Sequence, residues 1–311
     1  MREHRFPSSN GTDTVYAKIY APTGTPRGVV QISHGMAEHI GRYDEFMRYL
    51  STNGYVACGN DHIGHGRTAK TRGDLGYMAP KNGFDYLVTD LHLFTIYMRG
   101  KYPDLPYFLL GHSMGSFAAR LYIARYGHEL TGAVLSGTGA GMAVLPAAAA
   151  VKKLAGGRGG KKPCKALDRL AFGSYNNAIR KPKTPFDWLS RDAASVAAYI
   201  TDPYCGFVFS ASAFGDLFTG LYRANKREWF SSVPKDLPLL LVSGDQDPVG
   251  DYGRGVRRVR DGLQTAGVKD VQLKLYPGGR HEMLNELNRA QVYQDILGFL
   301  QKESGGAVDK G

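Results

Sequence analysis

Short apolar runs alternate with segments of helical periodicity along most of this 311-residue chain. Residues 28–32, 55–58 and 107–110 are predominantly apolar, which is typical of strands buried on both faces. Segments with apolar residues at helical spacing follow them at 43–53, 84–102 and 114–126. Strands that alternate with helices in this way pair in parallel and are covered on both sides. The sequence therefore predicts an α/β protein with a mostly parallel central sheet and helices on both faces.

The same pattern continues toward both ends of the chain. Residues 2–21 are expected to form a hairpin, because Asn10 and Gly11 make a turn signal and apolar and polar residues alternate after them. Later strands are expected at 133–136, 239–242 and 271–275, and later helices at 252–266 and 286–302.

The alternation stops between residues 139 and 234 and then resumes. An insertion between two strands of one sheet is the economical explanation. We therefore expect residues 1–139 and 235–311 to form one core, and residues 140–234 to form an inserted helical cap.

The first half of the expected cap is strongly basic. Residues 140–185 contain ten Lys and Arg and one acid, Asp168, so they carry +9 of the net charge of +11. The basic residues are Lys152, Lys153, Arg158, Lys161, Lys162, Lys165, Arg169, Arg180, Lys181 and Lys183. Such a block indicates a local electrostatic surface, which favours contact with an anionic membrane; a solvated face is the simpler alternative. No nucleic-acid-binding motif accompanies the charge, so nucleic acid is not an expected partner.

Cysteine usage indicates a reducing compartment. Cys58, Cys164 and Cys205 are too few and too scattered for a disulfide framework, and none is spaced from a His as metal ligands usually are. Residues 1–10 lack the apolar stretch of a signal peptide. Residues 130–151 are uncharged and long enough to cross a bilayer, but they are only weakly hydrophobic, so a strand, a loop and a small-residue helix are expected there. We expect a cytoplasmic protein with peripheral membrane contact through the basic segment.

One motif carries the strongest functional signal. Gly111-His112-Ser113-Met114-Gly115 matches G-x-S-x-G between an apolar run and a helical segment, which is the strand–turn–helix setting that this nucleophile motif requires. The turn is so tight that side chains at the two glycine positions would clash. Ser113 is expected at a helix N-terminus, where developing negative charge is stabilised. The alternative is a Gly-rich turn with an incidental serine.

A serine hydroxyl becomes a good nucleophile only when a base removes its proton. In hydrolases with this motif the base follows the acid and lies after the final strand. His281 follows the strand expected at 271–275, whereas His128 precedes a strand, so His281 is the predicted base.

The acid must lie between Ser113 and His281 and follow a strand. Asp245 and Asp247 both follow residues 239–242, and Asp251 is a more distant candidate. We favour Asp247, because the proline after it fixes an extended backbone, and we expect Asp245 to brace the loop.

Two backbone N–H groups are expected to bind the oxyanion of the reaction. The first belongs to Met114, the residue after the nucleophile, and the second comes from the loop after an earlier strand. Gly35 lets that loop turn inward after residues 28–32, which points to the N–H of Met36.

The chain resembles monoacylglycerol lipases and related lysophospholipases, in the broader group that also holds serine aminopeptidases. The segments that carry the resemblance are 34–39 (HGMAEH), 61–66 (DHIGHG), 111–115 (GHSMG), 244–249 (GDQDPV) and 280–282 (RHE). It covers nearly the whole chain except the basic first half of the cap. It implies an α/β-hydrolase core, a mobile lipophilic cap and no metal or organic cofactor, and it assigns the acid to Asp247 and the oxyanion donors to Met36 and Met114. Two positions depart from the common pattern: Met36 stands where a small residue is frequent, and Ser116 stands where another glycine is common.

Three functions remain open at this point. The leading hypothesis is a serine hydrolase for esters with a single acyl chain, such as a monoacylglycerol, a lysophospholipid or a short acyl ester. The residues expected to line an acyl tunnel, or else to pack the cap on the core, are Phe207, Phe209, Phe214 and Phe218. The second hypothesis is an aminopeptidase of the proline iminopeptidase type, which needs carboxylates for an α-ammonium group. The third is a membrane-surface or acidic-ligand binding protein on a hydrolase fold. The oligomeric state cannot be read from the sequence.

Overall fold

A computed structural model describes residues 1–140 and 160–305 of the chain. Eight strands form one sheet in the order β1-β2-β4-β3-β5-β6-β7-β8. Their bounds are β1 Arg2–Pro7, β2 Thr14–Tyr20, β3 Gly28–Ser33, β4 Tyr55–Asn60, β5 Tyr107–His112, β6 Gly132–Ser136, β7 Leu239–Gly244 and β8 Val271–Tyr276. β1 pairs with β2, and β2 with β4, in antiparallel fashion, whereas every pair from β4 to β8 is parallel. The prediction of a mostly parallel sheet is therefore confirmed.

Helices follow the strands as the periodicity predicted. Those that cover the sheet are α1 Asp44–Thr52, α2 Gly83–Lys101, α3 Met114–Tyr126, α9 Arg254–Thr265 and α10 Arg289–Gly305. Short 3-10 turns are η1 Ile40–Tyr43, η2 Arg72–Asp74, η3 Gly127–Glu129, η5 Asp187–Leu189 and η6 Met283–Asn285. The expected helix at 114–126 has the predicted bounds, and the other boundaries differ by up to three residues.

The sheet is buried on both faces, because the parallel strands carry apolar side chains that point to both sides. One apolar cluster joins the sheet to α2, α3 and α9, and includes Phe94, Phe117 and Val259. The other joins the opposite face to α1 and α10, and includes Phe46 and Ile296. These two layers hold the strands rigidly, so the loops at the carboxyl ends of the strands stand on a fixed frame.

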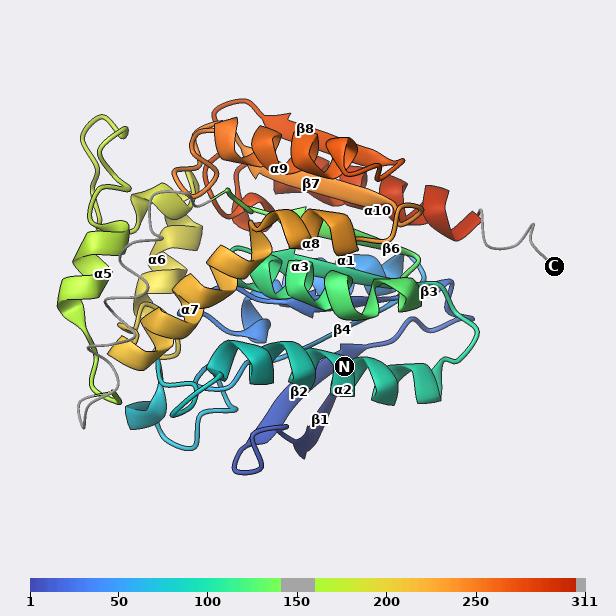
Figure 1. Ribbon diagram of the computed structural model, residues 1–311, viewed down its shortest axis with the longest axis horizontal. Helices are drawn as coiled ribbons and strands as arrows, with labels where there is room; N and C mark the ends of the chain where they lie inside the picture. The colour runs from blue at the N-terminus through green and yellow to red at the C-terminus, as the bar shows by residue number, and fades with distance from the viewer. Residues whose placement is uncertain (141–159, 306–311) are drawn as a thin grey trace.

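The residues between β6 and β7 interrupt this frame. Their described part forms α5 Lys165–Phe172, α6 Ala193–Thr201, α7 Ala211–Ala224 and α8 Arg227–Ser232. Figure 1 shows α5 and α6 beyond one end of the sheet, with α7 running back from them toward the core. β6 occupies the start of the uncharged window at 130–151, whereas residues 141–151 lie outside the described part. None of the described helices combines the length and the apolarity needed to cross a membrane.

A buried arginine ties the two ends of this insertion to the core. Arg120 lies on α3 and is 0% exposed. Its guanidinium donates to the carbonyl oxygen of Gly139 at 3.1 Å, before the insertion, and to Ala224 and the Asn225 side chain at the end of α7. It also stacks on Trp229 of α8, 4.1 Å from the ring centroid. Burial lowers the pKa of Arg120 to about 9.

We expect Arg120→Met to lower the free energy of unfolding by roughly 2–4 kcal/mol, because several buried carbonyl and amide oxygens lose their donor. Urea unfolding followed by circular dichroism measures this. Arg125→Met is the matched control, since this residue of the same helix makes a partly exposed ion pair with Asp85, and such pairs contribute about 0–1 kcal/mol. Equal midpoints for Arg120→Met and the wild type would contradict the anchoring role.

Candidate active site

Ser113 occupies a strained turn between β5 and α3. Its backbone has φ 53° and ψ −121°, a conformation that side-chain-bearing residues rarely adopt. The flanking glycines permit it: a Cβ on Gly111 would lie 2.4 Å from the carbonyl oxygen of Gly115, and a Cβ on Gly115 would lie 2.1 Å from that of Ser33. The turn therefore presses the start of α3 against the end of β3 and holds the Ser113 side chain at the carboxyl edge of the sheet.

His281 and Asp247 come to the same edge from the loops after β8 and β7. The Nδ1 atom of His281 lies 3.0 Å from each carboxylate oxygen of Asp247, and both side chains are buried. Asp247 also accepts from the backbone N–H of Val249 at 2.9 Å and from the Ser243 hydroxyl at 3.3 Å. Ser113 and His281 line one cavity. The structure thus brings together the three residues predicted from chain order.

The two competing acids, Asp245 and Asp251, have other partners. Asp245 accepts from the backbone N–H of Gly278 at 2.8 Å, so it braces the loop after β8, as expected. Asp251 forms exposed ion pairs with Arg254 and Arg258. Of the three candidate acids, Asp247 is the one whose carboxylate contacts the His281 ring.

Burial and Asp247 act on His281 in opposite directions. Burial disfavours the imidazolium, but the adjacent Asp247 carboxylate outweighs this and raises the pKa of His281 above its ordinary value of 6.5. The neighbouring His112 has no such partner: it lies near the hydroxyl of Ser136, and burial lowers its pKa to about 4. His281 is therefore the imidazole that can take up a proton here, while His112 stays neutral.

The loop after β3 lies directly against the nucleophile. A Cβ on Gly35 would lie 2.7 Å from the Glu38 Oε1 atom and 3.2 Å from the Ser113 Cβ atom, so a glycine at this position favours the close approach. The Glu38 carboxylate accepts from the backbone N–H of Gly35 at 2.5 Å and from the Tyr43 hydroxyl at 2.8 Å, which fixes the shape of the loop. Met36 and Met114, the predicted oxyanion donors, both line the cavity that contains Ser113.

A buried ion network joins this loop to the histidine loop. Arg42 donates to Glu38 at 2.8 Å and to both oxygens of Glu282, at 2.5 and 2.7 Å. Its guanidinium also lies over the ring of Tyr199 in α6, 4.9 Å from the centroid. Removal of one partner from a buried ion pair costs roughly 3–5 kcal/mol in proteins. The network therefore gives two loops a common rigid support: the loop after β3, which carries the predicted oxyanion donor Met36 and is called the oxyanion loop, and the loop that carries His281.

The cavity has a volume of about 500 Å³, within the range of small-molecule sites. The insertion supplies most of its apolar wall, including Phe172, Trp188 and Leu217. Of the four predicted tunnel residues, Phe207 and Phe218 line the cavity. Phe209 and Phe214 are 0% exposed and pack in the larger apolar cluster instead.

Two features of the site were missed by the sequence analysis. The Glu38–Arg42 spacing of four residues is a recognisable ion-pair signal, but nothing in the sequence connects it to Glu282, 240 residues away. The Trp188 ring lies tilted against the His281 ring, with centroids 5.1 Å apart, and the Trp188 carbonyl accepts from the His281 backbone N–H at 3.4 Å. No periodic pattern in the insertion indicated this contact.

We expect an NMR titration to give His281 a pKa above 6.5 in the wild type and below 6.5 in Asp247→Asn. In the variant burial remains, whereas the carboxylate that favours the imidazolium is gone. Because the neutral imidazole is the form that can accept a proton, proton uptake would then be possible at lower pH in the variant. An unchanged His281 pKa in Asp247→Asn would show that the carboxylate does not control this imidazole.

Comparison with known proteins agrees with this geometry. The model of the serine aminopeptidase S33 family matches residues 24–288. The chain is 32% identical to a monoacylglycerol lipase of Mycolicibacterium smegmatis, over 96% of both chains, and 30% identical to the human monoglyceride lipase, over 94% of this chain and 88% of that one. Among solved structures, a thermostable carboxyl esterase from Bacillus coagulans in complex with glycerol superposes with a TM-score of 0.92 at 36% identity, covering 97% of this chain and 98% of the esterase. The chain is therefore a member of the serine aminopeptidase S33 family of α/β-hydrolases.

Proposed function

We propose that the protein hydrolyses carboxylic esters that carry a single acyl chain, through an acyl-enzyme on Ser113. The observation that carries the proposal is the meeting of Ser113 and His281 in a largely apolar cavity, with Asp247 in contact with the His281 ring. The similarity to monoacylglycerol lipases of two organisms and to a carboxyl esterase supports the ester class.

The chemistry follows from the placement of these groups. The Ser113 hydroxyl attacks the ester carbonyl carbon while His281 takes its proton, and Asp247 stabilises the imidazolium that forms. The backbone N–H groups of Met36 and Met114 bind the negative oxygen of the tetrahedral intermediate. His281 then protonates the leaving alcohol, and a water molecule, deprotonated by the same imidazole, releases the carboxylic acid.

The insertion, residues 140–234, is proposed to act as a cap over the cavity. Its apolar side chains close the cavity above Ser113, and Phe207 and Phe218 are proposed to contact the acyl chain. Phe209 and Phe214, being fully buried among other apolar residues, are proposed to hold the cap together instead.

An aminopeptidase is the second candidate, and one observation favours it. Three carboxylates, those of Glu38, Asp168 and Glu282, line the cavity and could attract a substrate ammonium group. Two of them are already engaged: Arg42 donates to both oxygens of Glu282 and to one of Glu38, and Gly35 and Tyr43 donate to the other oxygen of Glu38. Asp168 is the one acid in residues 140–185, which carry ten Lys and Arg, so this part of the chain disfavours an ammonium group. The ester reaction therefore remains the preferred function.

Hydrolysis of p-nitrophenyl esters from acetate to palmitate tests the function. We expect the wild type to turn over these esters, with a chain-length optimum set by the cavity, and Ser113→Ala to lose about 10⁶-fold in kcat. An aminoacyl-naphthylamide, which carries the free ammonium group, is the control substrate and is expected to react poorly. The proposal would be overturned if the wild type hydrolysed none of the esters, or if it hydrolysed the naphthylamide faster than the esters.

We also propose that the basic part of the cap contacts anionic membranes. The described basic residues of this part are all exposed: Lys161, Lys162, Lys165, Arg169, Arg180, Lys181 and Lys183. Beside them the Leu170 side chain is 68% exposed. Lys152, Lys153 and Arg158 lie outside the described residues.

We expect sedimentation with vesicles containing phosphatidylserine to exceed that with neutral vesicles and to weaken as salt rises, because each basic residue near the surface contributes about 1 kcal/mol. Lys161→Glu combined with Lys165→Glu should reduce binding. Lys101→Glu combined with Lys302→Glu, on the core, is the control. Equal binding to both kinds of vesicle would exclude the electrostatic contact.

A further inference from the structure

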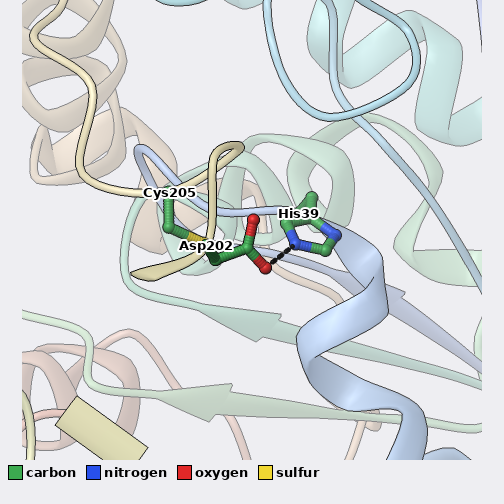
Figure 2. Close-up of side chains that lie close together, drawn as sticks. All are labelled: His39, Asp202 and Cys205. Atoms are coloured by element: carbon green, nitrogen blue, oxygen red, sulfur yellow. Dashed lines mark hydrogen bonds and ion pairs between the residues drawn. The ribbon is translucent and has the colours of Figure 1, made fainter. Parts of the chain in front are cut away.

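Three side chains with metal-ligand chemistry meet where the insertion touches the oxyanion loop. They are His39, which follows Glu38, and Asp202 and Cys205 from the turn after α6 (Figure 2). One ligand atom from each lies within 4.8 Å of the other two, and the His39 Nε2 atom is 2.9 Å from the Asp202 Oδ2 atom. Since 163 residues separate His39 from Asp202, a search for ligand spacing in the sequence could not find this cluster.

The turn that carries Asp202 and Cys205 is held in place by its backbone. The N–H of Cys205 donates to the Asp202 carbonyl at 3.0 Å, and the N–H of Tyr204 donates to the Asp202 Oδ1 atom at 2.8 Å. The N–H of Gly206 donates across to the carbonyl of Ala37 at 3.0 Å. These bonds present the Oδ2 atom and the thiol on the same side of the turn, as Figure 2 shows.

The position of the His39 ring is also fixed by its neighbours. A Cβ on Gly41 would lie 2.7 Å from the His39 Cε1 atom, so the ring fills the space that glycine leaves open. The His39 Nδ1 atom accepts from the Gly41 N–H at 3.2 Å, which places the ring proton on Nε2, toward Asp202. Coordination through Nε2 moves this proton to Nδ1, so the Gly41 N–H loses its acceptor and must bond to water instead.

We propose that His39, Asp202 and Cys205 bind a Zn²⁺ ion, with water as the fourth ligand. Imidazole, carboxylate and thiolate are the side chains that Zn²⁺ takes in proteins, at distances of about 2.0–2.3 Å, which puts neighbouring ligand atoms about 3–4 Å apart. To reach that arrangement from separations of up to 4.8 Å, the side chains rotate and the turn that carries Asp202 and Cys205 shifts slightly toward the ion. All three residues are only partly buried, which leaves access for the ion and its water.

The Cys205 thiol must lose its proton to coordinate the ion. Zinc binding displaces that proton into solvent, as it does at other thiolate sites.

Zinc at this position clamps the insertion to the oxyanion loop. The turn already holds the Ala37 carbonyl through Gly206, and the Tyr199 hydroxyl donates to the same oxygen at 3.1 Å. Ala37 follows Met36, whose N–H is the proposed oxyanion donor. A shift of the turn toward the ion displaces this donor, so bound zinc is expected to lower kcat more than it changes KM.

Titration of the reduced full-length protein with Co²⁺ tests the site directly, because the thiolate-to-cobalt charge-transfer band reports a sulfur ligand. We expect one equivalent of Co²⁺ to produce the band and Zn²⁺ to displace it. Cys205→Ser should abolish the band, and His39→Gln should weaken binding by more than the roughly 10- to 100-fold that loss of an outer-shell partner costs. Cys164→Ser, which removes another partly buried thiol of the insertion, is the matched control and should bind as the wild type does.

No band in the wild type, or a band that persists in Cys205→Ser, would overturn the zinc site. The effect of bound zinc on the oxyanion loop rests on the proposed function. It is measured separately, as the rate at which a fluorophosphonate labels Ser113. We expect Zn²⁺ to slow labelling of the wild type and of Cys164→Ser, a chelator to reverse this, and Cys205→Ser to be unaffected. Slowing that persists in Cys205→Ser would overturn the coupling, whereas absence of ester turnover would leave the Co²⁺ result standing.

Discussion

The close approach of α3 to the end of β3 is the steric constraint on which the site depends. It requires a residue without a side chain at Gly115, where a Cβ would lie 2.1 Å from a β3 carbonyl oxygen. The positive φ of Ser113 follows from this contact, because the chain must reverse within one residue to start the helix there. The two hydrophobic layers on either side of the sheet keep the contact rigid, so an otherwise unfavourable backbone conformation persists in the folded protein.

Charged groups inside the protein divide into two kinds. Arg42 is balanced by Glu38 and Glu282, and the three side chains tie together two loops that meet only in the folded chain. Arg120 is bound by oxygens that carry no formal charge, and burial lowers its pKa. Both arrangements depend on these hydrogen bonds, since a buried charge without partners would be strongly destabilising.

The parts of this protein that local patterns determine were predictable from the sequence. Apolar runs and helical spacing located β3 to β8 and the helices that cover them, and the order of the loops selected Ser113, Asp247 and His281. The insertion was less predictable, because its helices pack through contacts between distant residues. Phe209 and Phe207 are two positions apart, yet one packs in the apolar cluster and the other lines the cavity. The same holds for Glu282, whose partner Arg42 lies at the other end of the chain.

The convergence of both ends of the insertion on Arg120 has an evolutionary consequence. Gly139 and Ala224 are held by one side chain of the core, so the intervening chain begins and ends at nearly the same point. A segment anchored in this way can be lengthened, shortened or exchanged between descendants without moving the strands on either side. Changes of length or sequence within the insertion can therefore accumulate without disturbing the loops that hold Ser113, Asp247 and His281.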